Sequence, residues 1–170
     1  PIWHQEIRDI IVLKNNKGTE DNRVRKLDYS IQLSALFYQR FIDNEKITLF
    51  SPHDVAGLYD SFGTESFDDL YKQYELDESI PKTEVNAQEL ILDLLKERAE
   101  TGRVYLMNID HCNSHSSFID KVEMSNLCQE ITLPTKPIQH IDDKTGEIAL
   151  CILSAINVGK IRDLSDLEVL

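Results

Sequence analysis

The feature of this sequence that most constrains its fold is an uninterrupted apolar run near the end of the chain, from Ile148 to Leu153. A strand with one buried face alternates apolar and polar residues, so a run without alternation is typical of a strand covered on both faces. Parallel sheets flanked by helices bury their strands in this way. The run therefore predicts a buried strand and, together with the helices described next, an α/β fold.

The clearest helix is predicted from about Ala87 to Glu100, where apolar residues recur at helical spacing. Asn86 is suited to cap its first turn, and Glu89 can bond back to the N–H of the cap residue. Gly102 can adopt the left-handed conformation that ends a helix, and a strand is expected directly afterwards, from Val104 to Asn108. Similar spacing indicates helices within residues 2–11, 33–41 and 67–74, and residues 47–50 are typical of a short strand. A helix is also expected to begin within residues 164–170, where Ser165 could cap it.

Composition and charge exclude several classes of function. Thirty acidic residues against eighteen basic ones give a formal charge of −12, and the only dense basic group, Arg23, Arg25 and Lys26, is expected to lie in a solvated loop. Direct binding to DNA or RNA is therefore not expected. The sequence has no run of eighteen or more apolar residues, so no transmembrane helix is expected. Its cysteines number three, and an odd number without a signal peptide fits a reducing cytoplasm.

An amide, a thiol and a carboxylate recur at every second residue, at Asn126, Cys128 and Glu130. In an extended segment, side chains two apart point the same way, so these three groups would line one side of a strand or loop. The thiol can supply a nucleophile or a radical, the carboxylate can move a proton, and the amide can hold a hydroxyl group. Spacing alone favours the simpler interpretation, in which Cys128 is a small core residue and its polar neighbours face solvent.

The remaining cysteine and histidine groups have simple interpretations. Cys151 lies in the apolar run and is expected to be a buried structural cysteine unless a second thiol lies within disulfide reach. Residues 111–115 bring three possible metal ligands together, but no second cluster completes a zinc site, so local hydrogen bonding is expected instead. The glycines form neither a dinucleotide-binding fingerprint nor a phosphate loop.

The segment Ser125–Ile131 resembles the active-site loop of class I ribonucleotide reductase large subunits. The resemblance is of the enterobacterial type and extends in order over essentially the whole chain. On this basis residues 1–170 are identified as a central fragment of the catalytic barrel domain of such a subunit. The segments that carry the resemblance outside the loop are residues 1–6, 11–18, 49–55, 107–115, 139–143 and 149–157.

The resemblance implies a particular fold. It is a ten-stranded α/β barrel made of two antiparallel halves of parallel strands, with a central loop that presents a radical-forming cysteine. By this resemblance, residues 104–108 and 148–156 are strands of the barrel wall, and residues 124–131 form the central loop.

The resemblance also implies a role for each candidate residue. Cys128 matches the cysteine that becomes a thiyl radical and removes the 3′ hydrogen of the ribonucleotide. Glu130 matches the carboxylate that takes the 3′-hydroxyl proton, and Asn126 matches the amide that hydrogen-bonds the hydroxyl groups of the substrate. Cys151 matches one of the two cysteines that reduce the 2′ position and end as a disulfide. Cys112 matches no catalytic position.

The implied activity is the reduction of ribonucleoside diphosphates to deoxyribonucleoside diphosphates for DNA synthesis. The chain is expected to hold no cofactor or metal of its own. A metal-containing small subunit would supply the radical, ATP and deoxynucleotide effectors would bind elsewhere in the large subunit, and thioredoxin or glutaredoxin would restore the thiols. The partner of Cys151 would precede Pro1, and other parts would follow Leu170. The isolated chain is therefore expected to be inactive, to expose an apolar wall and to associate.

Other interpretations stay open at this point. An adenosylcobalamin-dependent reductase shares the Asn-x-Cys-x-Glu chemistry, and a non-catalytic acidic α/β binding domain would use its cysteines only structurally. Convergence of the three polar groups on one cavity is the geometry that separates an enzyme from such a binding domain. The sequence leaves open whether the chain is a natural half-subunit that assembles with its complement.

Overall fold

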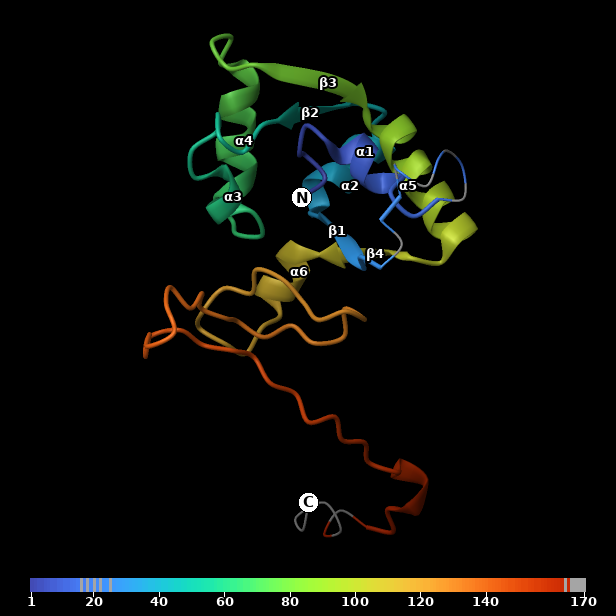
Figure 1. Ribbon diagram of the computed structural model, residues 1–170, viewed down its shortest axis with the longest axis vertical. Helices are drawn as coiled ribbons and strands as arrows, with labels where there is room; N and C mark the ends of the chain where they lie inside the picture. Colours follow the sequence, from blue (N-terminus) through green and yellow to red (C-terminus); the bar gives the residue numbers. More distant parts are fainter. Residues whose placement is uncertain are drawn as a thin grey trace.

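The computed structural model describes residues 1–15, 17, 19, 21, 23–24, 26–163 and 165. Its elements are α1 (Ile7–Ile11), β1 (Tyr29–Leu33), α2 (Ala35–Ile42), β2 (Lys46–Phe50), α3 (Leu58–Ser61), α4 (Phe67–Leu76), β3 (Lys82–Asn86), α5 (Ala87–Thr101), β4 (Val104–Asn108), α6 (Ile109–Ser114) and a short 3-10 helix, Val158–Lys160. The β2–β3 ribbon lies above the β1–β4 pair in Figure 1, with α3 and α4 on one side and α5 on the other. Beyond α6 the chain forms loops and then a long extended arm.

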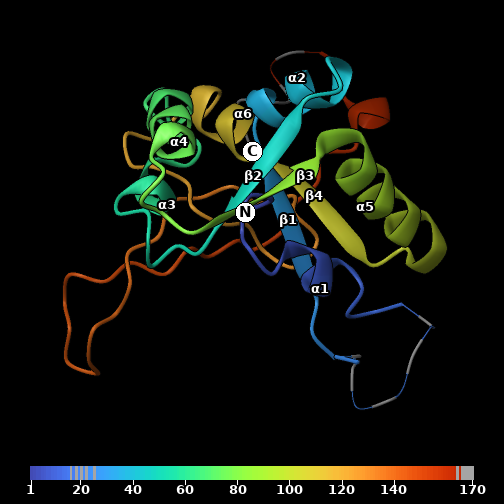
Figure 2. The ribbon, with the colours of Figure 1, turned by 90° about the horizontal axis from the view of Figure 1, so that it is seen from above.

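Two two-stranded sheets form the β-structure of the described residues. β1 and β4 pair in parallel, with Tyr29 opposite Val104 and Leu33 opposite Asn108. β2 and β3 pair antiparallel. Seen from above, α5 lies alongside β4 (Figure 2). A parallel pair connected through helices confirms the predicted α/β class, whereas the strands described do not close a barrel.

Local signals predicted α5 and β4 correctly. The Asn86 side chain accepts a 3.0 Å hydrogen bond from the backbone N–H of Glu89, and Gly102 follows the helix with a φ of 64°. β4 then begins at Val104, as expected from the sequence. The strand predicted at 47–50 is β2, and the helices predicted within 33–41 and 67–74 are α2 and α4.

The start of the chain differs from the helix predicted within residues 2–11. Residues 2–6 form turns around a β-bridge between His4 and Phe50, and α1 begins only at Ile7. Ile2 and Trp3 are nevertheless fully buried, and the carbonyl of Trp3 accepts a 2.9 Å hydrogen bond from the N–H of Phe50. The apolar spacing therefore detected burial correctly, but contacts with β2 replace a first helical turn.

An aromatic cluster occupies the centre of the core. The Phe62 ring lies 6.1 Å from Trp3 and 4.6 Å from Phe67, and Phe37 lies 5.5 Å from Tyr71. All five side chains are buried. Each such ring pair contributes about 0.5–1.5 kcal/mol beyond the area that it buries, so the cluster ties the start of the chain to α2 and α4.

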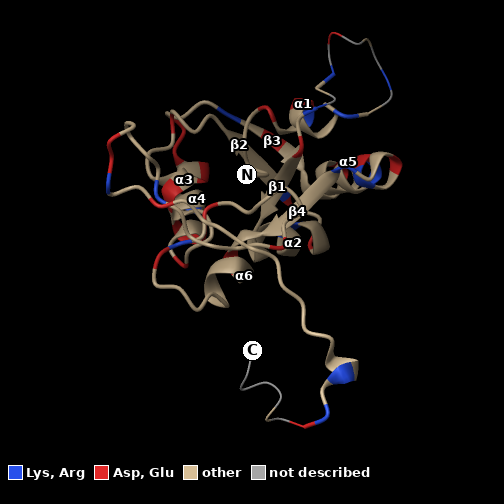
Figure 3. Ribbon diagram, turned by 60° about the horizontal axis from the view of Figure 1, so that its bottom comes forward, with Lys and Arg blue, Asp and Glu red and all other residues tan. Residues whose placement is uncertain are grey.

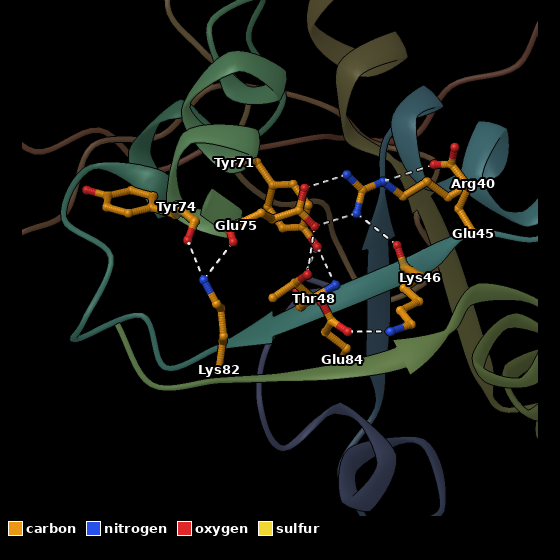
Figure 4. Close-up of polar contacts among 9 residues, drawn as sticks. All are labelled: Arg40, Glu45, Lys46, Thr48, Tyr71, Tyr74, Glu75, Lys82 and Glu84. Carbon is orange, nitrogen blue, oxygen red and sulfur yellow. Dashed lines mark hydrogen bonds and ion pairs between the residues drawn. The ribbon is translucent and has the colours of Figure 1, made fainter. Parts of the chain in front are cut away.

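A buried ion pair links α2 to α4 beside this cluster (Figure 4). Arg40 donates two hydrogen bonds of 2.5 Å to the carboxylate of Glu75 and one of 2.8 Å to the carbonyl of Lys46. The Thr48 hydroxyl donates to Glu75 at 2.7 Å, and the Tyr71 hydroxyl donates to the Thr48 carbonyl at 2.6 Å. Burial raises the pKa of the Tyr71 phenol, so it remains a neutral donor at physiological pH.

The strand predicted at 148–156 is not formed in this structure. This segment has no regular structure; it lies in the arm, which Figure 3 colours as uncharged residues up to the short helix at 158–160. Ile148 is 77% exposed and Ile152 is 87% exposed. The apolar pattern marks a segment suited to burial, but a strand also needs a hydrogen-bonded neighbour, and none of the described strands pairs with residues 148–156.

Two further predictions concern a helix at the end of the chain and the absence of a membrane-spanning helix. The helix predicted at 164–170 lies outside the described residues except for Ser165. Among the helices that the structure describes, none has the length and apolar character needed to cross a bilayer.

Candidate active site

The candidate residues of the 124–131 loop lie in a turn that Asn126 organises. The Asn126 Oδ1 atom accepts a 3.0 Å hydrogen bond from the N–H of Ile131, across the mouth of the loop. The Ser125 hydroxyl donates to the carbonyl of Ile131 at 2.5 Å. Gln129 donates through its side chain to the Asn126 carbonyl at 2.8 Å. Residues 125–131 are therefore closed by their own hydrogen bonds.

The backbone within this loop is not extended, which corrects the expected alternation of side chains. Residues 127 and 128 form a turn, and Gln129 has a φ of 67°, in the left-handed region. The Asn126 side chain bonds local backbone groups, and this competes with an extended conformation. The relative directions of Asn126, Cys128 and Glu130 are thus set by a turn and not by strand geometry.

The three loop residues differ in burial. Cys128 and Glu130 are exposed, and Asn126 is half-buried. Cys128 is therefore not the small core residue that spacing alone favoured. Cys151 is also exposed, because the apolar run that contains it is uncovered, so the expectation of a buried structural cysteine is wrong for this structure.

A cavity of about 760 Å³ brings part of the candidate site together. Asn126 and Cys151 both line it, next to the apolar side chains of Met124 and Ile131. Cys128 and Glu130 are not among its lining residues. The described residues thus bring one loop residue and the second cysteine to a common cavity, and leave the thiol and carboxylate of the loop facing outward.

Lys136 is one of the charged residues that line this cavity, and sequence reasoning missed it. Its ammonium lies 2.8 Å from a carboxylate oxygen of Glu147 and 3.3 Å from one of Asp120. Hydrogen bonding to Glu147 and Asp120 raises the pKa of Lys136. Lys136 and Glu147 also exchange backbone hydrogen bonds of 3.1 and 3.0 Å at the base of a hairpin-like turn. The only sequence signal for this contact was the group of turn-forming residues that separates them, Asp143 to Gly146.

A second cavity, of about 530 Å³, lies where β1 and β4 end. Asp110 lines it and accepts a 2.7 Å hydrogen bond from the N–H of Ala35 at the start of α2. Burial raises the pKa of Asp68, which lines the same cavity, and the charge of Asp110 adds to this effect. Both cavities are lined mainly by apolar surface, but four acidic residues line this one and two line the cavity beside Asn126.

The histidine cluster makes local contacts. His115 Nδ1 lies 3.1 Å from the carbonyl of His111, and the two rings are 5.8 Å apart. Within the part of the chain that the structure describes, no group of three His, Cys, Asp or Glu side chains could hold a metal ion. Cys112 is half-buried, and burial raises the pKa of its thiol.

Comparison with known proteins identifies the class to which this fold and loop belong. Residues 1–169 match the family described as ribonucleotide reductase, barrel domain. A match over this share of the chain shows membership, so the chain belongs to the ribonucleotide reductase barrel-domain family.

Several relatives within this family are alpha subunits of ribonucleoside-diphosphate reductases. The chain is 56% identical over 169 residues to the ribonucleoside-diphosphate reductase subunit alpha of Haemophilus influenzae, a match that covers 96% of the chain and 22% of that protein. It is 54% identical over 143 residues to ribonucleoside-diphosphate reductase 1 subunit alpha of Escherichia coli, covering 81% of the chain and 19% of that protein. The corresponding subunit of Enterobacteria phage T4 is 42% identical, covering 99% of the chain and 24% of that protein. The chain thus spans about a fifth to a quarter of the length of these curated relatives.

Proposed function

We propose that this chain is a central part of the catalytic alpha subunit of a class I ribonucleoside-diphosphate reductase. The observation that carries the proposal is the family match over residues 1–169, which includes the complete Ser125–Ile131 loop. The names of the relatives favour this activity over an adenosylcobalamin-dependent reductase, because they describe alpha subunits of a diphosphate reductase. The enzyme would act in the cytoplasm with a metal-containing small subunit as its radical source.

In this proposal each residue of the loop has a separate chemical role at the ribose of the substrate. Cys128, as a thiyl radical, removes the 3′ hydrogen atom, and a thiol suits this step because its S–H bond is weak. Glu130 takes the 3′-hydroxyl proton, and Asn126 hydrogen-bonds the hydroxyl groups of the substrate. Cys151 and a second cysteine elsewhere in the subunit reduce the 2′ position: the 2′ C–O bond breaks, the hydroxyl group leaves as water, and a hydrogen takes its place. The two thiols supply the two electrons and two protons for this exchange and close a disulfide, which thioredoxin or glutaredoxin then reduces.

Features of the structure support this assignment. The exposed Cys128 thiol and Glu130 carboxylate can reach a ligand, and Asn126 and Cys151 line the same cavity. The uncovered apolar arm at 148–156 is suited to burial by further strands of a barrel. In the complete subunit, such strands would enclose the loop and bring Cys151 toward it.

A chimeric subunit tests the proposal. Residues 1–170 replace the matching segment of the Haemophilus influenzae alpha subunit, and turnover of a ribonucleoside diphosphate is measured with the small subunit and a thiol reductant. We expect turnover by the chimera and none after Cys128→Ser, because a hydroxyl group does not replace a thiol in hydrogen-atom transfer. Cys112→Ser is the matched control and is expected to leave turnover unchanged.

The same assay can contradict the proposal in two ways. Equal turnover by the chimera and its Cys128→Ser variant removes the assigned role of the thiol. A chimera that folds and binds the small subunit but has no turnover shows that this chain does not carry the proposed catalytic groups.

A further inference from the structure

Two side-chain amides hold the chain at the point where it enters the 124–131 loop. The Asn113 side chain accepts from the N–H of Val122 at 2.8 Å and donates to the carbonyl of the same residue at 3.0 Å. Gln32 donates through Nε2 to the carbonyl of Glu123 at 2.6 Å. We call these three contacts the amide anchor. They bind consecutive backbone groups that belong to no sheet ladder.

Both amides project from regular elements of the core. Gln32 lies in β1, and its Nε2 atom is also 3.7 Å from the sulfur of Met107 in the paired strand β4. Asn113 lies in α6, and its Nδ2 atom donates a second hydrogen bond, of 3.0 Å, to the carbonyl of Ile109. The Val122 side chain is fully buried, so packing and hydrogen bonds fix the same residue.

Gly63 leaves the room that Asn113 occupies. A Cβ atom added at Gly63 would lie 2.9 Å from the Asn113 amide nitrogen and 2.7 Å from a side-chain carbon of Ile109. Real Cβ atoms do not approach neighbours so closely, and the φ of 88° at Gly63 disfavours other residues as well. A side chain at Gly63 would therefore displace the Asn113 amide from its contacts with Val122.

The anchor and the loop together determine where Cys128 lies. Residues 125–131 are closed by their own hydrogen bonds, so the loop can move as one unit relative to the core. The anchor, at residues 122–123, is the fixed point directly before that unit. We propose that Asn113 and Gln32 are positioning residues that set the location of Cys128 for hydrogen-atom transfer, an inference that rests on the proposed function.

The test uses the chimeric alpha subunit with Asn113→Asp and, separately, Gln32→Glu. Each change keeps the shape of the side chain but replaces an N–H donor with an oxygen that faces a backbone carbonyl. A displacement of about 1 Å at a reacting group can lower a rate about 100-fold, so we expect kcat to fall by about 10- to 100-fold while KM stays nearly unchanged. Hydrogen exchange of residues 122–131 should become faster in both variants.

Gln88→Glu provides a matched control. Gln88 donates through Nε2 to the carbonyl of Phe41 at 3.0 Å, a contact between α5 and α2 that does not involve the loop. The substitution removes the same kind of amide-to-carbonyl hydrogen bond. We expect it to leave kcat, KM and hydrogen exchange at residues 122–131 unchanged.

The possible outcomes separate this inference from the proposed function. Wild-type kcat in both folded variants, or a rise in KM alone, overturns the positioning role. Failure of Asn113→Asp to fold leaves Gln32→Glu to decide, and failure of both shows that the amides serve stability alone. If Cys128→Ser retains turnover, the proposed function fails, and unchanged exchange at residues 122–131 in the two amide variants then rejects the anchor independently.

Discussion

The Arg40–Glu75 ion pair illustrates how much a single residue can matter in this chain. The pair is largely removed from solvent, with side-chain exposures of 10% and 17%, and Arg40 makes a bidentate contact. Removing one member of a buried pair leaves the other charge without compensation, which costs more than the pair itself contributes. Its position between α2 and α4 couples two elements that also share the aromatic cluster.

We predict that Arg40→Ala lowers the free energy of unfolding by about 3–5 kcal/mol, because the Glu75 carboxylate is left buried and unpaired. The control is Lys46→Ala, which breaks an ion pair with Glu84 whose members are 68% and 52% exposed. That change should cost less than about 1 kcal/mol, since solvent screens exposed pairs. Denaturant unfolding can follow the buried Trp3, the only tryptophan of the chain. Equal effects of the two substitutions would contradict this account.

The carboxyl group of Asp143 leads to a prediction about pH dependence, again at the scale of a single residue. Hydrogen bonds from the Thr145 hydroxyl and from the backbone N–H groups of Gln139 and Thr145 lower its pKa to about 2, from an ordinary value of 3.8. Because the folded pKa is the lower one, its contribution to the turn is present above 3.8 and is lost as the pH falls through about 2. An NMR titration of the Thr145 amide should report this midpoint. A midpoint near 3.8, or the same titration in Asp143→Asn, would reject the assignment.

At the scale of elements, sequence reasoning succeeded where local chemistry sets the boundary. α5 and β4 follow from a cap residue, a periodic face and a terminal glycine, all within one stretch of chain. β1 and β3 were not predicted, and the strand at 148–156 was predicted but is not formed, because strand formation depends on partners distant in sequence. Within the candidate site, the residue types of the loop were predicted, but its turn at Gln129 and the amides of Asn113 and Gln32 depend on tertiary contacts that no spacing reveals.

The cap of α5 can be tested by itself. We predict that Asn86→Ala lowers the free energy of unfolding by about 1 kcal/mol, because the N–H of Glu89 loses its acceptor. Asn86→Ser, which retains an oxygen acceptor at the cap, should recover most of this loss. Thermal and denaturant unfolding of the two variants provide the comparison, and equal destabilisation by alanine and serine would show that the cap bond is not the source of stability.

For the whole molecule, the uncovered apolar arm is the dominant feature. Ile148, Leu150, Ile152 and Leu153 are each at least 73% exposed, and they follow one another along the arm. Contiguous apolar surface of this kind favours association, whereas single exposed apolar residues are common and harmless. The arm is therefore the part of the chain that most requires a covering partner, which in the proposed subunit is the rest of the barrel.

We predict that the isolated chain associates and that Leu150→Asp combined with Ile152→Asp reduces this association. Ile141→Asp is the control, because Ile141 is 98% exposed but lies in the turn between Lys136 and Glu147, outside the arm. Sedimentation velocity over a range of concentrations measures the effect. A monodisperse wild-type monomer would contradict this prediction, as would an equal effect of the control substitution.

The central claim is that Cys128 carries the hydrogen-atom chemistry of a ribonucleoside-diphosphate reductase. The most direct measurement compares turnover of a ribonucleoside diphosphate by the chimeric alpha subunit carrying Cys128→Ser with turnover by the same subunit carrying Cys112→Ser. We predict no deoxyribonucleotide from the first variant and unchanged turnover from the second. Comparable turnover by the two variants would contradict the claim.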